Sequence, residues 1–306
     1  MCLAWLCGIL LFIQPAQPPD SLTIESGGES VITVNRMDYT SPFPDIPLID
    51  IEKLSELLDV VDKQTYQAPK NAYISQSGKV NAEEIGRRLH RKAFTDLFYT
   101  YFYSTNASKI EVPMLPIHPR VDRDLLLHIH VKQIGRYVTF FNQGNKARSH
   151  NIALAAEAIN NHVVFPGETF SFNRVVGKRT MRRGYLRAPV IVRGELAEDI
   201  GGGICQVSST LFNSADRAGL KITERYSHSK KVPYVPTGRD AAVSWYGPDF
   251  RFKNEYSFPL LIRARAYEGQ MAIQIYSSDE IEYEPRIVPG ASKTLPEEIP
   301  SNGEER

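Results

Sequence analysis

The chain is short of cysteine, of net charge and of long apolar segments. Only three of its 306 residues are cysteine, and its charged side chains almost cancel, to a net charge of +1. A balanced charge gives no electrostatic argument for a nucleic-acid partner, so none is expected. Cys2 and Cys7 lie in the first apolar run, which leaves Cys205 as the one thiol of the remaining chain. A single cysteine cannot form an intrachain disulfide, and no Cys/His spacing typical of a zinc site accompanies it.

The apolar run near the N-terminus is too short to cross a bilayer comfortably. It covers residues 2–13, whereas a membrane-spanning helix needs about 20 residues. Its length suits the h-region of a signal peptide, but no Lys or Arg precedes it and no small-x-small cleavage site follows it. We therefore expect residues 1–14 to be a signal peptide or a short membrane anchor of an exported protein. The alternative is a buried N-terminal helix, which the proline-rich "PAQPP" disfavours.

Familiar catalytic and phosphate-binding motifs are also missing. The sequence contains no GxxxxGK[ST], HExxH or GxSxG pattern and no internal repeat. His128 and His130 alternate as they would on one strand face, but no Cys or third His lies nearby. We therefore expect no metal site and no cofactor.

Composition divides the remaining chain into four parts. Residues 15–47 are rich in Pro, Ser and Gly and predict a linker, with room for one short strand at "SVITVN". Residues 48–116 predict a small α+β module whose second helix begins with Asn81 as its N-cap. Residues 124–277 predict a larger unit of strands and helices. Residues 278–306 are polar and proline-rich, which is typical of a tail with little fixed structure.

The larger unit predicts a mostly antiparallel sheet with a few packed helices. "LLLHIHVKQIGRYVTFF" is strand-like, and "SHNIALAAEAINNHV" is typical of a helix with Ser149 as its N-cap. "YLRAPVIVRGELAE" predicts a hairpin that turns at residues 193–194. "DAAVSW" opens a run of alternating strands with a later turn at residues 268–269. The expected fold class is α+β.

The stretch "DIGGGICQVSSTLFNSADRAGL" carries the main candidate site. Apolar side chains recur at helical spacing after the cysteine and stop at Gly219, which predicts a helix over about 206–218 with Cys205 at its first turn or cap. The unpaired N–H groups and the dipole at a helix N-terminus favour a thiolate and can hold an oxyanion. The three preceding glycines allow a substrate to approach the backbone closely.

A thiol nucleophile needs a base, and His228 is the nearest candidate after this helix. Asp240 opens the next predicted strand, where it could orient the imidazole. The order Cys, His, Asp, with the Cys opening a helix, fits the layout of papain-like and transglutaminase-like folds. In the alternative interpretation Cys205 is inert, His228 caps a loop carbonyl and Asp240 pairs with Arg239 or caps a turn.

Two further groups of side chains are candidates for binding. Residues around the three catalytic candidates are expected to contact a substrate. These are Gly201, Gly202, Gly203, Gln206, Ser208, Arg225, Tyr234 and Arg239. In "KRTMRRGYLR", Arg179, Arg182, Arg183 and Arg187 lie together. This arginine cluster could contact phosphate or carboxylate groups, or it could be a solvated loop.

Five sequence blocks carry a family resemblance. In chain order they are "PGETFSFN", "GGGICQVSSTLFN", "ERYSHS", "VPTGRDAAVSW" and "DFRFKN". With them, residues 135–266 resemble the VanW family. Residues 48–116 resemble more loosely the peptidoglycan-binding module that often precedes VanW domains, through "PKNAYIS", "EEIGRRLHR" and "KIEVPML".

The resemblance implies an extracytoplasmic protein of the bacterial cell envelope, secreted or membrane-anchored, whose partner is peptidoglycan or another wall polymer. Some members of the family are encoded near glycopeptide-resistance genes. The resemblance carries no established reaction, so the roles of Cys205, His228 and Asp240 rest on the residues alone. The enzymatic hypothesis is a cysteine-dependent peptidoglycan hydrolase or acyl/peptidyl transferase. The alternative is a non-catalytic peptidoglycan-binding or scaffolding protein.

Overall fold

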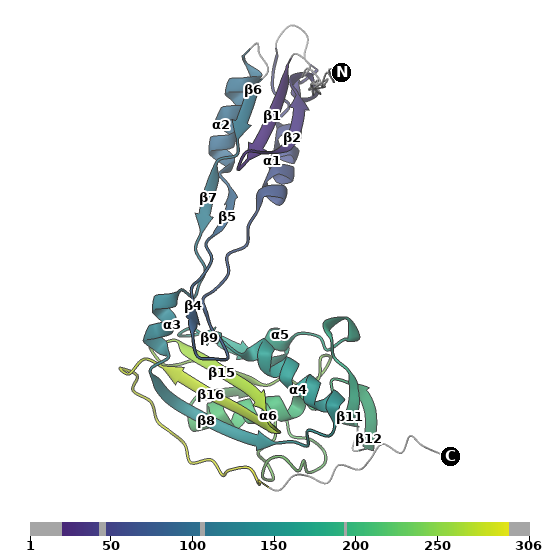
Figure 1. The fold of residues 1–306 in the computed structure, drawn as a ribbon, viewed down its shortest axis with the longest axis vertical. Coiled ribbons are helices and arrows are strands. Elements are labelled where there is room, and N and C mark those ends of the chain that lie inside the picture. The colour runs from purple at the N-terminus through teal and green to yellow at the C-terminus, as the bar shows by residue number, and fades with distance from the viewer. Residues whose placement is uncertain (1–19, 43–46, 105–107, 193–194, 294–306) are drawn as a thin grey trace, which may run out of the picture. The chain divides into compact units, whose positions relative to one another are not determined.

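The protein folds into two compact units, each described here by itself (Figure 1). The computed structural model describes residues 20–42, 47–104, 108–192 and 195–293. Unit 1 is drawn from Met1–Asn71 and Glu83–Arg120, and unit 2 from Ala72–Ala82 and Val121–Arg306. The chain therefore passes between the units three times. The single boundary predicted between 116 and 124 misses the segment 72–82, which belongs to the second unit.

Unit 1 packs helices against a small sheet of order β2-β1-β6, in which β1 is antiparallel to β2 and parallel to β6. Its strands are β1 (Ser21–Ser26), β2 (Glu29–Asn35), β6 (Ser108–Glu111) and the antiparallel pair β5 (Gly86–Leu89) and β7 (Met114–Ile117). Its helices are η1 (Arg36–Tyr39), α1 (Ile51–Thr65) and α2 (Arg91–Phe102). Leu22 and Ile24 are fully buried against these helices. The prediction of a linker over 15–47 is therefore wrong for β1 and β2, whose Leu22, Ile24 and Val34 belong to a hydrophobic core.

The second helix of unit 1 begins later than its sequence pattern predicts. Asn81 lies in a short strand, and α2 starts only after His90, which caps it by accepting a hydrogen bond from Ala93 N. The intervening residues 86–89 form β5, which pairs with β7. Gly86 allows the backbone of Gln67 and Pro69 to come so close that a side chain at this position would meet it at 2.5 Å. Tertiary pairing has overridden a helical pattern that glycine weakens.

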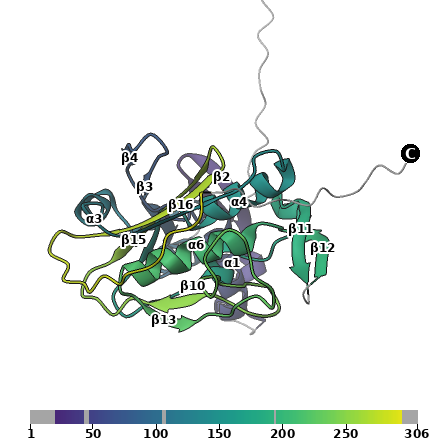
Figure 2. The same cartoon turned by 90° about the horizontal axis from the view of Figure 1, so that it is seen from below.

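Unit 2 is built from two antiparallel sheets with helix α6 between them (Figure 2). The four-stranded sheet, in the order β8-β16-β15-β9, comprises β8 (Lys132–Phe140), β9 (His162–Val164), β15 (Leu260–Tyr267) and β16 (Gln270–Ser277). The three-stranded sheet comprises β10 (Thr169–Ser171), β14 (Arg251–Lys253) and β13 (Lys221–Glu224). Two hairpins are added, β3 (Tyr73–Ile74) with β4 (Val80–Asn81) and β11 (Arg187–Val192) with β12 (Glu195–Ile200). The helices are α3 (Arg123–Ile129), α4 (Lys146–Ile159), α5 (Phe172–Val176), η2 (Met181–Arg183) and α6 (Ile204–Arg217). The predicted α+β class with a mostly antiparallel sheet is confirmed.

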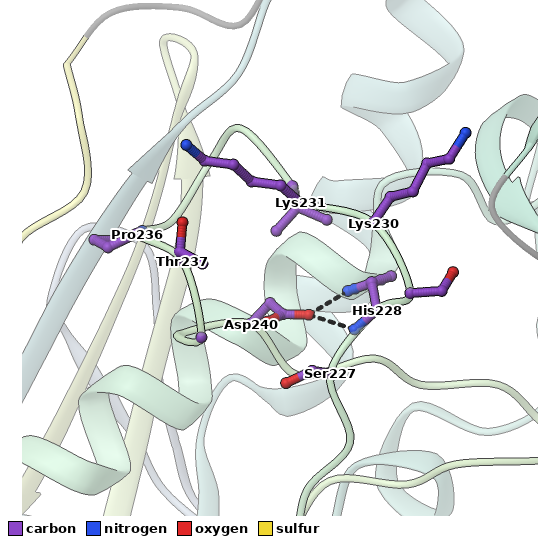
Figure 3. A pocket seen from close by; sticks show the side chains of 10 residues that line it. Ser227, His228, Lys230, Lys231, Pro236, Thr237 and Asp240 are labelled. Atoms are coloured by element: carbon purple, nitrogen blue, oxygen red, sulfur yellow. Dashed lines mark hydrogen bonds and ion pairs between the residues drawn. The ribbon is translucent and has the colours of Figure 1, made fainter.

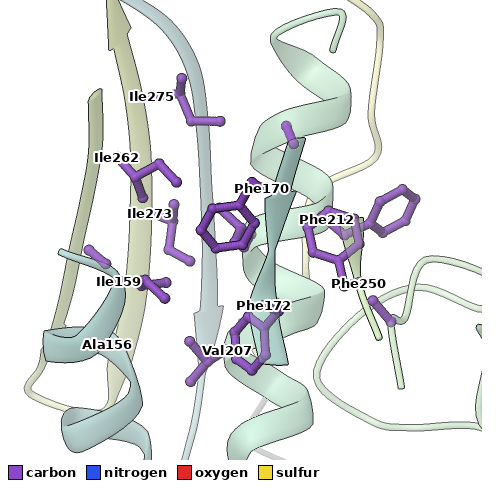
Figure 4. Close-up of a cluster of buried hydrophobic side chains, with 14 of the residues drawn as sticks. Ala156, Ile159, Phe170, Phe172, Val207, Phe212, Phe250, Ile262, Ile273 and Ile275 are labelled. Atoms are coloured by element: carbon purple, nitrogen blue, oxygen red, sulfur yellow. The ribbon is translucent and has the colours of Figure 1, made fainter. Parts of the chain in front are cut away.

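Helix α6 is fixed at the centre of unit 2 because both sheets bury side chains against it (Figure 4). Val207 meets Ile262 and Ile273 from the larger sheet, and Phe170 and Phe250 close the core on the side of the smaller one. Each such buried side chain contributes about 1.5–3 kcal/mol. The apolar stripe predicted for residues 206–218 is confirmed, and the helix carries Cys205 as its second residue.

The hairpin of β3 and β4 joins unit 2 through the outer face of the larger sheet. Successive strand residues point to opposite faces, so Leu261 turns away from Ile262 and packs with Ile74 and Ile129. The Asn161 side chain also accepts a hydrogen bond from Ile74 N at 3.0 Å and donates one to Ile74 O at 3.1 Å. These contacts explain why the hairpin belongs to unit 2 although the chain on either side of it belongs to unit 1.

Three local predictions in unit 2 need correction or limits. The segment that contains His128 and His130 is not one strand, because α3 holds His128 and His130 is its C-cap. Among the described residues no group of three or more His, Cys, Asp or Glu side chains is placed to hold a metal. Helix α4 is capped by Asn145 and not by Ser149. The strands β11 and β12 pair as predicted, while the turn at 193–194 lies outside the described residues.

The C-terminal segment 278–293 is packed on unit 2, which corrects the prediction of an unstructured tail for that part. Ile281 and Val288 are buried, and Arg286 donates hydrogen bonds to Asp216 Oδ1 at 2.9 Å and to Leu220 O at 3.0 Å. The segment is polar on average, but its two buried apolar side chains, Ile281 and Val288, are enough to hold it against unit 2. Residues 1–19 and 294–306 lie outside the description, and the described residues contain no helix long and apolar enough to cross a membrane.

This packing predicts opposite results for two isoleucines in the same segment. Ile281→Ala removes a side chain that is 2% exposed and should lower the free energy of unfolding by about 2–5 kcal/mol. Ile287→Ala removes one that is fully exposed and should change it by less than about 0.5 kcal/mol. Urea unfolding followed by circular dichroism measures both. Equal, small effects would mean that the segment is not docked.

Candidate functional site

The site begins at the first turn of α6. Gly203 is the N-cap residue, with a φ of 102° that favours glycine, and Cys205 follows as the second helical residue. The Cys205 side chain is partly buried, and its Sγ lies 3.6 Å from the Val243 carbonyl oxygen. The thiol therefore lies at the helix N-terminus, where the dipole favours negative charge, although the N–H groups of Ile204 and Gln206 already donate to Gly201 O and Gly203 O.

His228 and Asp240 meet beside this thiol. His228 donates two hydrogen bonds to Asp240 Oδ2, one from its backbone N–H and one from Nδ1, each of 2.6 Å (Figure 3). The imidazole also lies near enough to Cys205 for the two groups to shift each other's pKa. The structure thus brings together the three side chains that the sequence proposed as nucleophile, base and orienting acid.

The electrostatics of this trio favour an ion pair. Burial alone would raise the pKa of Cys205, but the hydrogen bond and charge of His228 outweigh it and lower that pKa below its ordinary value. Burial would lower the pKa of His228, but Cys205 and Asp240 together raise it to about 9. Burial would raise the pKa of Asp240, whose hydrogen bonds from His228 instead lower it. Each of these shifts favours the charged form of its group, that is thiolate, imidazolium and carboxylate.

Asp240 is held in place by the polar side of α6. Ser208 Oγ donates to Ala241 O at 2.5 Å, Ser209 Oγ accepts from Ala241 N at 2.9 Å, and Asn213 Nδ2 donates to Arg239 O at 2.8 Å. The helix therefore grips the backbone on both sides of Asp240. The strand predicted to open at Asp240 does not exist, because these side chains take the hydrogen bonds that a sheet neighbour would have made.

Comparisons with known proteins agree with this geometry. Residues 147–276 match the family model described as VanW like protein. The chain is 55% identical over 292 residues to the uncharacterized protein YoaR of Bacillus subtilis (strain 168), covering 95% of this chain and 96% of that one. The chain belongs to the VanW family. It is also 34% identical over 110 residues to the vancomycin B-type resistance protein VanW of Enterococcus faecalis (strain ATCC 700802 / V583), covering 34% of this chain and 40% of that one. No solved structure matches the chain.

Cys205, His228 and Asp240 all lie within the VanW-matching segment, but several residues expected to bind substrate beside them serve the fold. Gln206 is fully buried, and its Nε2 donates to Thr139 Oγ1 at 3.0 Å and to Phe140 O at 2.9 Å. Ser208 is also fully buried. Neither side chain can reach a substrate, which corrects those two predictions. Tyr234 is largely buried as well, and it interacts electrostatically with Cys205.

The two predicted arginines of this VanW loop brace the segment that carries Asp240. Arg225 Nη1 donates to Asp240 O at 2.7 Å, and Arg239 pairs with Asp216 at 2.7 Å. Both guanidinium groups lie over the ring of Phe212. These contacts give both arginines a positioning role, while their contact with a substrate stays a prediction.

A pocket opens on the His228–Asp240 side of the VanW site (Figure 3). Its volume is about 290 Å³, and Lys230 and Lys231 contribute to its wall, with side chains that extend away from the His228–Asp240 pair. Cys205 is not among its lining residues. The pocket therefore reaches His228 and Asp240 without reaching the thiol, in a basic surrounding that suits an anionic ligand.

The arginine cluster of the VanW segment does not act as one group. Arg182 and Arg183 are exposed, whereas Arg179 is half-buried and interacts electrostatically with Cys205. Sequence reasoning did not separate Arg179 from its neighbours, nor did it find Asn173, whose Oδ1 accepts a hydrogen bond from Arg179 at 2.8 Å. The only signal in the sequence was that Asn173 lies in a family block and Arg179 in the arginine cluster. Neither position reveals where the side chain points.

The three glycines before Cys205 make room for the protein itself. A side chain on Gly202 would lie 2.6 Å from the carbonyl oxygens of Ala188 and Pro189 in β11, and one on Gly201 would meet the stem of Arg179 at 3.2 Å. Close packing of the VanW fold thus accounts for Gly201 and Gly202, and contact of the glycine turn with a substrate stays a prediction.

Gly202→Ala should therefore destabilise the protein even though its backbone conformation suits any residue. The added methyl group meets backbone atoms, which cannot rotate away, so a loss of about 1–3 kcal/mol is expected. Urea unfolding of Gly202→Ala and of the matched control Gly290→Ala, whose Cβ would meet nothing within 4 Å, measures it. A Gly202→Ala protein as stable as this control would show that the loop is loosely packed.

The ion pair predicts that Cys205 is alkylated rapidly at neutral pH and that His228→Ala removes this property. Without the imidazole, burial dominates and the thiol pKa should rise, so the thiolate fraction at pH 6–7 should fall at least about tenfold. The rate of reaction with iodoacetamide against pH measures it, in a Cys2→Ser/Cys7→Ser background that leaves one thiol. His118→Ala is the control, because His118 is an exposed residue of unit 1. An unchanged profile in His228→Ala would refute the ion pair.

Proposed function

We propose that the VanW-like unit catalyses acyl transfer from an amide of peptidoglycan, with Cys205 as nucleophile, His228 as general acid and base, and Asp240 as the group that orients His228. The observation that carries this proposal is the hydrogen-bonded pair of His228 and Asp240, with Cys205 near enough to His228 for the two groups to shift each other's pKa. A nucleophile, a base within hydrogen-bond reach and a third group that orients the base are the parts that covalent acyl transfer requires.

The reaction would proceed in two steps. The Cys205 thiolate attacks the carbonyl carbon, the C–N bond breaks, and the His228 imidazolium gives its proton to the departing amine. A thioester on Cys205 remains. Water or an acceptor amine then attacks that thioester, His228 takes the proton from the attacking group, and the thiolate leaves. Hydrolysis results when water attacks, and transfer results when an amine does.

The substrate class rests on the family. Relatives include a vancomycin B-type resistance protein, which supports a role of this chain at the bacterial cell envelope. Peptidoglycan is the polymer of that compartment in which peptide amides are abundant. Its stem peptides also carry carboxylates, which fit the basic wall that Lys230 and Lys231 give to the pocket. Vancomycin-resistance-related action on the wall is therefore the process we assign to this chain.

The test is a reaction with purified muropeptides, with and without an added amine acceptor. The wild type should change their masses, and intact-protein mass spectrometry should trap a thioester on Cys205. Cys205→Ala should abolish both signals. His228→Ala should lower the rate by about 10²–10⁴-fold, because the proton transfers lose their catalyst.

The exposed His118→Ala variant should keep full activity and so control for general effects of substitution. Full activity of Cys205→Ala would refute the proposal. Thermal unfolding of each variant separates loss of chemistry from loss of fold.

Binding without catalysis is a second candidate, which the pocket favours because it lies beside His228 and leaves Cys205 out of its lining. In that case the protein would hold a carboxylate-bearing stem peptide, and unit 1 would contact the wall polymer. A pulldown of the full chain with insoluble peptidoglycan tests it. Equal retention of wild type and Cys205→Ala, with no mass change in any muropeptide, would support binding alone, and no retention would exclude it.

A further inference from the structure

Arg179 lies at the Cys205 site although it comes from a different part of the chain. It belongs to the turn between α5 and η2, and its Cβ and Cγ lie where a side chain on Gly201 would be, at 3.2 and 3.3 Å from that position. Gly201 has a φ of 93° and stands four residues before Cys205. The glycine therefore admits the stem of Arg179 to the start of α6.

The guanidinium of Arg179 is anchored by a network that returns to the thiol. Nη1 donates to Asn173 Oδ1 at 2.8 Å and to Gly177 O at 3.3 Å. Asn173 Nδ2 in turn donates to Ser244 O at 2.9 Å, and Ser244 follows Val243, whose carbonyl lies 3.6 Å from Cys205 Sγ. Within the described part of the chain, Nε and Nη2 make no hydrogen bond. The anchor therefore uses one nitrogen and leaves two others able to donate.

The charges of Arg179 and Cys205 act on each other. Burial lowers the pKa of Arg179, and the nearby Cys205 raises it again, while Arg179 helps to lower the pKa of Cys205. A guanidinium remains protonated under all conditions in which the enzyme folds. The other groups that bear on Cys205 are His228 and the neutral Tyr234.

We propose that Arg179 is a second, permanent cation of the Cys205 site, which stabilises the thiolate and then, through Nε and Nη2, the oxyanion formed when that thiolate attacks a carbonyl. The part about the oxyanion rests on the proposed function, and the part about the thiolate does not. His228 gives up its proton to the leaving amine in the first step and takes one from the attacking group in the second, so its charge changes during both steps. Arg179 keeps its charge throughout, which is what preorganised stabilisation of an oxyanion requires.

The experiment compares Arg179→Gln, Arg179→Lys and the exposed control Arg182→Gln in the Cys2→Ser/Cys7→Ser background. Alkylation of Cys205 is measured against pH with neutral iodoacetamide and with anionic iodoacetate. Arg179→Gln should raise the apparent thiol pKa by about 0.5–1 unit and lower the iodoacetate-to-iodoacetamide rate ratio severalfold. Arg179→Lys should keep both values near those of the wild type. A merely structural residue would not change the reagent ratio in this charge-dependent way.

A pH profile and reagent ratio in Arg179→Gln equal to those of Arg182→Gln would overturn the proposal. If Arg179→Gln does not fold, His228→Ala decides. This variant keeps Arg179, so it should retain part of the wild-type iodoacetate-to-iodoacetamide rate ratio. Complete loss of that part would count against the proposal. On muropeptides, Arg179→Gln should lose about 10²–10³-fold in kcat. Inactive wild-type protein would defeat the proposed function, yet the alkylation result would still decide whether Arg179 stabilises the thiolate.

Discussion

The site depends on one constraint, which is that the polar side of a fully buried helix must find its hydrogen bonds. Helix α6 has a sheet on each side, so Ser208, Ser209 and Asn213 cannot turn to water. An unpaired buried hydroxyl or amide costs about 1–3 kcal/mol. These side chains are satisfied by the backbone of residues 239–241. Burial of the helix thereby fixes the segment that carries Asp240, and Asp240 in turn fixes His228.

This arrangement explains how a loop without regular structure can hold Asp240 and His228 in a fixed position. Residues 225–250 contain no strand or helix, and loops of that kind are usually mobile. Here the loop is attached at several points to a helix that cannot move without disrupting the main core. The same helix presents Cys205 at its first turn. Cys205 and Asp240 therefore share one rigid support, and His228 lies beside both.

Patterns that depend on local burial were predictable, and patterns decided by distant partners were not. The apolar stripe of α6 follows from helical periodicity, and the β15–β16 hairpin follows from alternation around the turn at 268–269. The helix predicted from Asn81 failed because backbone far along the chain pairs with that segment. The strand predicted at Asp240 failed because side chains of α6 take its backbone hydrogen bonds. The chain order Cys, His, Asp identified the trio correctly as neighbours. It gave no information on Arg179, because the direction of that side chain depends on the space left by Gly201.

The glycines before Cys205 have a structural role that the sequence pattern does not suggest. A Gly-rich turn before a nucleophile is readily interpreted as an open approach for substrate, whereas Gly201 and Gly202 are both occupied by the protein's own atoms. One admits the stem of a cation and the other admits the backbone of β11. The role of the glycine turn is therefore to let the Arg179 side chain pack at the start of a helix whose dipole already favours an anion. Imidazolium, guanidinium and helix N-terminus then all favour the ionised form of Cys205, and only burial opposes them.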